Sequence, residues 1–287
     1  MNVTIVNPHG YCVGVHNAMA IALKAKEEHP NANVYLLGLL IHNEEAIAEL
    51  ESKGLIVLDE RKKDLLDYLL DLKKGDVVVF SAHGHPSSYD DLARAKGLIL
   101  VDATCRYVSE NTASAQGVHN VIYVGLSNHL ESQAFLANCP DASFYDVLTG
   151  NFPYLRVKGR SNTPTIITQT TLSGSEVDKA LEDITHYFPK AILAKQRCFS
   201  TTLRQSAIAA LPEDIEEVIV LGSKRSNNSL KLAEIASSKG FSTHLCLGLE
   251  DVKALDLKGK KKIALSSGAS TSEKTFQDVL TYLKGLD

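Results

Sequence analysis

Three equally spaced cysteines constrain this chain more than any other feature of its sequence. Cys12, Cys105 and Cys198 are separated by 93 residues in each step. Each follows an apolar run typical of a strand and precedes a stretch with helical periodicity. Self-similarity at a fixed period indicates repeated structural units. The spacing therefore predicts three units of similar size, each of which carries one thiol at the same position.

The polar loops at the predicted strand ends repeat as well. His42 and His83 are 41 residues apart, as are His129 and Thr170, and Asn228 and Ser270 are 42 apart. Strands alternate with helices throughout, which favours parallel sheets with ligand loops at the carboxyl ends of the strands. We therefore expect an α/β fold of three pseudo-threefold-related units of parallel sheet, covered by helices, around a central cavity. The expected units are residues 1–104, 105–196 and 197–287.

The bulk composition argues against several classes of function. The chain has 287 residues and a net charge of −4, so it lacks the basic surface that attracts nucleic acid or an anionic membrane. No apolar run approaches the ~20 residues that span a bilayer, and the first residues are typical of a strand rather than a signal peptide. We expect a cytoplasmic protein with no nucleic-acid or membrane partner. Five cysteines in such a chain indicate thiols that are buried, catalytic or metal-bound.

Three thiolates at one centre suit an iron–sulfur cluster. They can hold three irons of a 4Fe-4S cluster and leave the fourth iron open to bind a substrate oxygen. Zinc is less favoured, because the closely spaced cysteine pairs of structural zinc sites are missing. The alternative is that each cysteine is an ordinary small core residue, which is our interpretation of Cys139 and Cys246.

The loops around the cysteines are rich in neutral hydrogen-bonding groups, and each leads into a predicted helix. Helix N-termini carry unpaired amides and partial positive charge, so such loops can bind a phosphate or diphosphate. The alternative role for the serines and threonines is simple helix capping, which does not account for the histidines. The residues concerned are His42, Asn43, Ser81, His83, His129, Glu131, Thr170, Thr171, Ser226, Asn228, Ser229 and Ser270.

Glu131 is a carboxylate in this mostly neutral set, two residues after His129. A carboxyl group beside an iron-bound hydroxyl could deliver a proton and help that hydroxyl leave as water. It could equally be an ordinary glutamate in the first turn of a helix, and the residues alone leave both interpretations open.

In its longer motifs the chain resembles the hydroxymethylbutenyl diphosphate reductase family, also called IspH or LytB. The resemblance extends over nearly the whole chain in order. It implies a three-unit α/β fold with a central, oxygen-sensitive 4Fe-4S cluster held by three cysteines. It also implies an activity, the reduction of an allylic alcohol diphosphate to isopentenyl and dimethylallyl diphosphates. This reaction belongs to isoprenoid biosynthesis by the methylerythritol phosphate pathway. The motifs are Gly10-Tyr11-Cys12-Val13-Gly14-Val15, His42-Asn43, Phe80-Ser81-Ala82-His83-Gly84, Asp102-Ala103-Thr104-Cys105, His129-Leu130-Glu131, Thr168-Gln169-Thr170-Thr171-Leu172-Ser173, Gly222-Ser223-Lys224 and Gly268-Ala269-Ser270.

The resemblance also implies roles for individual residues. Cys12, Cys105 and Cys198 correspond to the cluster ligands. Glu131 corresponds to the proton donor, with Thr170 beside the substrate hydroxyl and His129 also in the catalytic set. The implied substrate-binding residues are His42, His83, His129, Thr170, Ser226, Asn227, Asn228 and Ser270. Electrons would come singly from ferredoxin or flavodoxin.

Five positions depart from the usual family pattern, namely His9, Arg106, Leu130, Asn227 and Ser272. None removes an implied cluster or catalytic residue, but they surround the site. Leu130 would free the backbone between His129 and Glu131, and Arg106 would place a cation beside a ligand thiolate. The alternatives are a diverged cluster-binding paralogue that acts on another small substrate, such as a lyase or desulfurising enzyme, and a redox or iron sensor.

Overall fold

The structure is a computed structural model that describes residues 1–157, 163–194 and 198–286. Its helices are α1 (Val13–Glu28), α2 (Glu44–Ser52), α3 (Leu65–Asp71), α4 (Ser87–Lys96), α5 (Arg106–Ala115), α6 (Leu130–Asn138), α7 (Gly174–Tyr187), α8 (Phe199–Ala209), α9 (Asn227–Ser238), α10 (Leu249–Lys253) and α11 (Glu273–Lys284). Its strands are β1 (Asn2–Ile5), β2 (Val34–Leu37), β3 (Ile56–Leu58), β4 (Val77–Phe80), β5 (Ile99–Asp102), β6 (Val121–Gly125), β7 (Ser143–Asp146), β8 (Asn151–Tyr154), β9 (Thr165–Thr168), β10 (Ile192–Leu193), β11 (Glu217–Leu221), β12 (Ser242–Cys246) and β13 (Lys262–Ser267).

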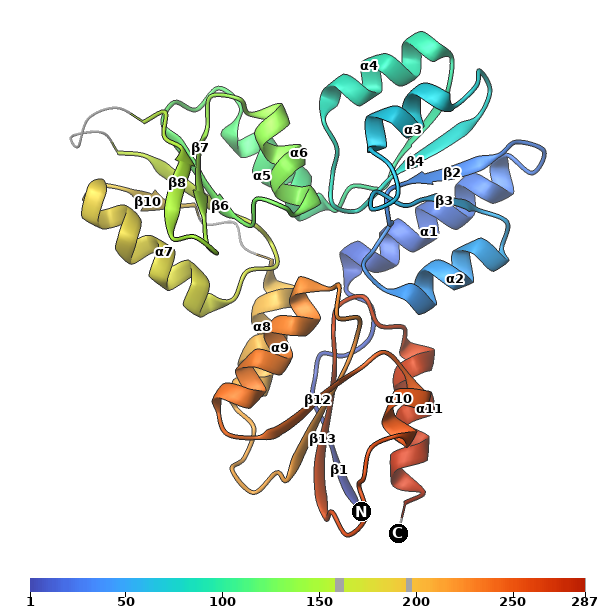
Figure 1. The fold of residues 1–287 in the computed structure, drawn as a ribbon, viewed down its shortest axis with the longest axis vertical. Coiled ribbons are helices and arrows are strands. Elements are labelled where there is room, and N and C mark those ends of the chain that lie inside the picture. Colours follow the sequence, from blue (N-terminus) through green and yellow to red (C-terminus); the bar gives the residue numbers. More distant parts are fainter. Residues whose placement is uncertain (158–162, 195–197, 287) are drawn as a thin grey trace. The chain divides into compact units, whose positions relative to one another are not determined.

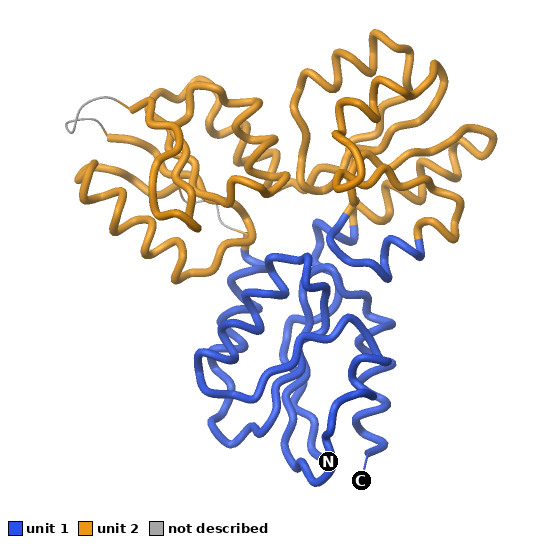
Figure 2. Tube along the Cα trace, in the orientation of Figure 1, with its two compact units in different colours: residues 1–16, 41–49, 199–287 blue, residues 17–40, 50–198 orange. Residues whose placement is uncertain are grey.

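The chain divides into two compact units built from discontinuous segments (Figure 2). Unit 1 contains residues 1–16, 41–49 and 199–287, and unit 2 contains residues 17–40 and 50–198. Unit 1 holds one sheet and unit 2 holds two. The division into three units at 104/105 and 196/197 stays a prediction, and the second of these boundaries lies outside the described residues.

The sheet of unit 1 has the strand order β1-β13-β11-β12, and its pairings are parallel. Strand β11 alternates between two buried faces. Ile219 packs with Phe276 and Val279 of α11, whereas Val218 packs on the other face with core residues of α8 and α9. Figure 1 shows α8 and α9 on one side of the sheet and α10 and α11 on the other. Helices therefore cover both faces, as a continuous apolar strand requires.

The most N-terminal strand belongs to this sheet of C-terminal strands. Val3 pairs with Ile263 and Ile5 with Leu265, so β1 joins β13 rather than the sheet of β2 to β5. The order of the strands along the chain did not indicate this pairing.

Unit 2 contains a sheet with the order β3-β2-β4-β5, which is parallel throughout. Leu69 of α3 and Ala93 of α4 pack with Val78 and Phe80 of β4 on one face. The Val-Val-Val-Phe run of β4 is typical of a buried strand, and all four residues are buried.

The second sheet of unit 2 has the order β10-β9-β6-β7-β8. Val177 and Ile184 of α7 pack on one face, and Phe135 of α6 packs on the other. Ser173 and Glu176 form a capping box at the start of α7. Strands β7 and β8, which the sequence did not indicate, pair antiparallel at one edge. The α/β fold with parallel sheets covered by helices is thus confirmed, with one antiparallel hairpin added.

The predicted site residues follow the carboxyl ends of parallel strands. Each cysteine comes after such a strand, namely β1, β5 or β10, and directly before a helix. The polar loops follow β2, β4, β6, β9, β11 and β13. Ligand loops gather at this edge of a parallel sheet. Among the described residues, no helix is long and apolar enough to cross a membrane.

Candidate functional site

The three predicted cluster cysteines share one local environment. Each is partly exposed and directly precedes the first residue of a helix. The Cys12 amide donates to the Ala269 carbonyl at 3.0 Å, and the Cys105 amide donates to the Ala82 carbonyl at 3.0 Å. The Cys12 sulfur accepts from the Val15 amide at 3.4 Å. Amides at a helix N-terminus stabilise an anionic ligand such as a thiolate, so the donor set fits a cluster.

The other two cysteines differ from these three. Cys139 and Cys246 are buried in the apolar cores around α6 and α11. Burial raises the pKa of both thiols, that of Cys246 to about 11. Cys12 lies in unit 1, whereas Cys105 and Cys198 lie in unit 2. Within the described residues of either unit, no three His, Cys, Asp or Glu side chains are placed to hold a metal ion.

Glu131 is buried at the first turn of α6, with only 2% of its surface exposed. Its Oε1 accepts from the Thr170 amide at 2.8 Å, and its Oε2 accepts from the Thr170 hydroxyl at 2.7 Å. The Tyr123 hydroxyl donates to Oε1 at 3.5 Å. Burial raises the pKa of Glu131 to about 7, although the bonds from Thr170 and Tyr123 oppose this rise. A carboxyl with this pKa can hold and release a proton near neutral pH, which a solvated glutamate of a first helical turn does not do.

Two predicted histidines meet beside this carboxyl in unit 2. The rings of His83 and His129 lie edge to face with their centroids 5.6 Å apart. His129 is the N-cap of α6, and its Nδ1 accepts from the Glu131 amide at 3.2 Å. The His83 Nδ1 lies 3.4 Å from the Ser81 hydroxyl. The structure therefore brings His83, His129, Glu131 and Thr170 together at one end of the unit.

Gln169 organises the loop that carries Thr170, although the sequence assigned it no role. It is 2% exposed. Its Oε1 accepts from the Leu126 amide at 2.9 Å and the Ser132 hydroxyl at 3.3 Å, and its Nε2 donates to the Thr171 hydroxyl at 2.8 Å. One side chain thus ties the loop after β6 to the loop after β9. A glutamine directly after a buried strand was the available signal for this role.

A second group of buried polar residues lies in unit 1, at the carboxyl ends of β11 and β13. Asn228 is 3% exposed, and neither its Nδ2 nor its Oδ1 has a hydrogen-bond partner among the described residues. The same holds for the hydroxyls of Ser229 and Ser266. Each such group costs about 1–3 kcal/mol when it is buried without a partner. A ligand with several acceptor oxygens could bind the donors here.

Two glycines, Gly222 and Gly268, leave room for the buried Ser229 side chain. A Cβ on Gly222 would lie 2.2 Å from the Ser229 hydroxyl, and one on Gly268 would lie 2.0 Å from the same atom. Gly222 also has a φ of +157°. The two loops therefore approach so closely that no side chain fits between them.

The other substrate residues predicted in unit 1 border the same loops. The Ser226 hydroxyl caps α9 by accepting from the Ser229 amide at 3.4 Å, and Asn227 is the first residue of α9. The Ser270 hydroxyl donates to the His42 carbonyl at 3.4 Å. Unit 1 thus brings His42 and Ser270 together, and the start of α9 holds Ser226, Asn227 and Asn228.

The departures from the family pattern have local partners. His9 stacks on Phe276 with centroids 3.9 Å apart, and its Nδ1 lies 3.0 Å from a Glu273 oxygen. Arg106 forms an ion pair with Glu110 along α5. Leu130 is the first residue of α6, so its backbone is helical. Ser272 caps α11 by accepting from the Thr275 amide at 3.0 Å.

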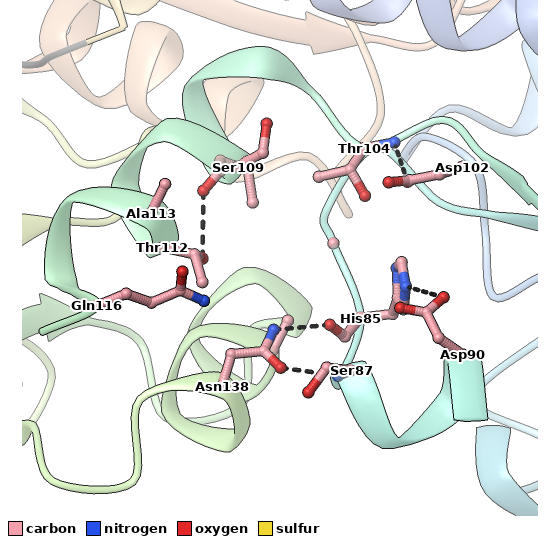
Figure 3. Close-up of a pocket in the computed structure, with 13 residues that line it drawn as sticks. His85, Ser87, Asp90, Asp102, Thr104, Ser109, Thr112, Ala113, Gln116 and Asn138 are labelled. Carbon is pink, nitrogen blue, oxygen red and sulfur yellow. Dashed lines mark hydrogen bonds and ion pairs between the residues drawn. The ribbon is translucent and has the colours of Figure 1, made fainter. Parts of the chain in front are cut away.

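A separate pocket of about 210 Å³ lies in unit 2 behind the Cys105 loop (Figure 3). His85 and Asp90 pair on its wall at 3.2 Å. Asn138 bridges its two sides by donating to the His85 carbonyl at 2.9 Å and accepting from the Ser87 amide at 2.7 Å. None of the predicted substrate or cluster residues lines this pocket.

Comparison with known proteins identifies one family. The sequence model of the LytB protein family matches residues 3–284. The 4-hydroxy-3-methylbut-2-enyl diphosphate reductase of Bacillus thuringiensis is 32% identical over 100% of this chain and 91% of its own length. The reductase of the same name from Macrococcus caseolyticus is 33% identical over 100% of this chain and 90% of its own length.

Two solved structures share the fold of this chain. The E-1-hydroxy-2-methyl-but-2-enyl-4-diphosphate reductase of Plasmodium falciparum superimposes with a TM-score of 0.84 at 27% identity, over 99% of this chain and 88% of that chain. A second structure, of an (E)-4-hydroxy-3-methyl-but-2-enyl diphosphate reductase, has a TM-score of 0.69 at 24% identity and covers 100% of both chains. The second likeness supports the fold alone.

Proposed function

This chain belongs to the LytB family, and we infer that it is an oxidoreductase of isoprenoid biosynthesis that reduces 4-hydroxy-3-methylbut-2-enyl diphosphate to isopentenyl and dimethylallyl diphosphates. The single observation that best supports this chemistry is the buried Glu131 carboxyl, held by Thr170 and with a pKa raised to about 7. The match of the whole chain to reductases favours this function over a redox or iron sensor.

We propose Glu131 as the proton donor to the leaving hydroxyl. The overall reaction takes up two electrons and two protons, breaks one carbon–oxygen bond and releases water. At neutral pH a carboxyl with this pKa is often protonated, so it can give its proton to the hydroxyl oxygen as the bond breaks. The Thr170 hydroxyl donates to Oε2 at 2.7 Å and so orients the carboxyl. We assign the same hydroxyl as the partner of the substrate hydroxyl.

We propose the unit 1 loops as a binding site for the diphosphate. The Asn228 amide and the Ser229 and Ser266 hydroxyls offer buried donors, and the N-terminus of α9 adds its first amides. Ser226, Asn227, Ser270 and His42 border these donors. The proposed substrate-binding set also includes His83, His129 and Thr170 of unit 2. Phosphate oxygens accept hydrogen bonds from all of these groups.

Cys12, Cys105 and Cys198 are the proposed ligands of a 4Fe-4S cluster. Such a cluster would supply single electrons and an open iron that acts as a Lewis acid. Their partial exposure at helix starts supports this assignment, in contrast to the buried Cys139 and Cys246. Ferredoxin or flavodoxin is the proposed electron donor, and the cytoplasmic location stays a prediction.

One anaerobic experiment tests the function. The full chain is reconstituted with iron and sulfide, mixed with a strong one-electron reductant and the diphosphate substrate, and its products are separated by chromatography. Formation of both five-carbon diphosphates is expected. A protein that carries the cluster but leaves the substrate unconsumed contradicts the proposal.

Matched cysteine variants test the ligand set in the same preparation. Cys105→Ala should lose most of the iron and the visible absorption of the cluster. Cys139→Ala should retain both, because Cys139 lies in the apolar core. Equal iron content in the two variants would exclude Cys105 as a ligand.

A further inference from the structure

The loop that carries Cys12 is fixed at three backbone positions within unit 1. The Gly10 amide donates to the Ser267 hydroxyl at 2.9 Å, and the Cys12 amide donates to the Ala269 carbonyl at 3.0 Å. The third position is the Gly10 carbonyl, which accepts from the guanidinium of Arg204 at 2.7 Å. Of these three bonds, only the last is made by a charged side chain.

Arg204 is almost completely buried, with 2% of its surface exposed. It lies on α8, the helix that begins directly after Cys198. Its Nη1 donates to the Ser200 carbonyl at 3.3 Å and contacts the Ser200 hydroxyl one turn earlier in α8, while Nη2 reaches Gly10. The planar guanidinium therefore joins the start of α8 to the loop two residues before Cys12. A buried, charge-assisted bond of this kind is stronger and more directional than one between neutral groups.

The backbone at Gly10 has a conformation and surroundings that suit glycine. Gly10 has a φ of +72°, a conformation that other residues rarely adopt. A Cβ at Gly10 would lie 2.7 Å from an oxygen of Glu273. Since Gly10 is buried, loss of Arg204 would leave the Gly10 carbonyl buried without this donor.

We propose that Arg204 is a positioning residue for Cys12. Its guanidinium holds the Gly10 carbonyl against α8 and so fixes the position of the Cys12 thiol relative to that helix. This inference rests on the proposed role of Cys12 as a cluster ligand. Arg204 does not contact substrate in this assignment. It acts through the loop.

The test measures the Cys12 thiol directly in the full chain purified without iron. Wild type, Arg204→Gln and Arg204→Lys are treated with iodoacetamide, and alkylation of each cysteine is followed by mass spectrometry. In Arg204→Gln the Cys12 rate, relative to the Cys105 rate in the same molecule, should rise about tenfold, as expected for loss of one buried hydrogen bond from a charged group. Arg204→Lys keeps the charge without the planar fork, so its ratio should lie between the other two.

Arg61→Gln is the matched control, because Arg61 is bonded to a carboxylate, Asp59, in unit 2. This variant should leave the Cys12 ratio unchanged. Far-ultraviolet circular dichroism checks that each variant is folded. Should Arg204→Gln not fold, Arg204→Lys decides the matter: a raised ratio supports the proposal and an unchanged ratio overturns it.

The reconstituted proteins then connect the loop to the cluster. The electron paramagnetic resonance spectrum of the reduced cluster should differ between wild type and Arg204→Gln and agree between wild type and Arg61→Gln. An unchanged Cys12 ratio overturns the proposal, as does a raised ratio with an unchanged spectrum. If the wild type binds no cluster at all, the proposed function fails. The alkylation ratio, measured without iron, still tests the role of Arg204 independently.

Discussion

At the carboxyl ends of β6 and β9, Glu131 accepts hydrogen bonds from Thr170 and Tyr123. At the carboxyl ends of β11 and β13, the equally buried Asn228 amide has no hydrogen-bond partner among the described residues. The hydrogen bonds of Glu131 come from the protein itself, which suits a group that must hold one proton in one orientation. The arrangement at Asn228 is incomplete, which suits a group that awaits a ligand. The two loop pairs therefore divide the proposed chemistry into proton transfer and diphosphate binding.

The largest expected effect is the loss of turnover when the Glu131 carboxyl is replaced. Glu131→Gln keeps the shape of the side chain but cannot donate the proton, so turnover should fall by about 10²- to 10⁴-fold, while the KM changes little. Steady-state kinetics with the reconstituted enzyme measure both. Glu217→Gln is the matched control. Glu217 is also buried, but it pairs with Lys260 and His244 at the amino end of β11, away from the loop that follows this strand. Comparable loss in both variants would contradict a catalytic role for Glu131.

The pH dependence of stability should identify the same group. The pKa of Glu131 is raised from 4.5 to about 7 in the folded protein, so folding favours the protonated form. Its contribution to the free energy of unfolding is full below about pH 4.5 and is lost as the pH rises to about 7, by roughly 3 kcal/mol. Denaturant unfolding across this pH range gives the free energy of unfolding of the wild type and of Glu131→Gln, and the difference between the two isolates the contribution of Glu131. A difference that does not change with pH would mean that Glu131 is ionised when buried.

Asn228→Ala should separate affinity from stability. The variant loses a proposed ligand of the diphosphate, so the KM should rise by about 10- to 100-fold with little change in kcat. Its free energy of unfolding without substrate should not fall, because the deleted atoms have no partner in the described structure. Asn111→Ala is the contrast, since the Asn111 amide donates to the Thr168 carbonyl at 3.1 Å. This variant should lose about 1–3 kcal/mol of stability.

The smallest expected difference lies between two capping serines of unit 1. Ser226 caps α9 and Ser272 caps α11. Replacement of either by alanine should cost about 1 kcal/mol of stability. Only Ser226→Ala should also raise the KM, because only Ser226 borders the unpaired donors. Equal KM values for the two variants would limit Ser226 to its capping role.

Local patterns of the sequence were enough to predict much of this arrangement. The buried β4 strand, the Ser173–Glu176 capping box and the strand–loop–helix position of each cysteine follow from short-range rules. The first-turn position of Glu131 could not show whether water reaches the carboxyl, and the structure shows that it is buried. Its role as proton donor stays a proposal.

Other features depend on contacts that no local pattern contains. Strand β8 includes Pro153, which weakens a strand prediction, and β12 mixes polar and apolar residues without alternation. Tyr123 looked like one more core residue of β6, since both faces of that strand are buried. Its hydroxyl acquires a partner only because α6 places Glu131 there. Gln169 likewise has a role only once two loops meet.

The pairing of β1 with β13 links the order of synthesis to the order of assembly. A ribosome adds about 5–20 residues per second, so β1 waits about 13–52 seconds for β13 to be synthesised. The Cys12 loop cannot bond to Ser267 and Ala269 before these residues have emerged. A nascent or truncated chain therefore presents Cys12 on an unanchored segment. With the proposed ligand set, iron loading follows synthesis of Ser267 and Ala269, and cluster content would report whether this segment and the Cys12 loop are joined.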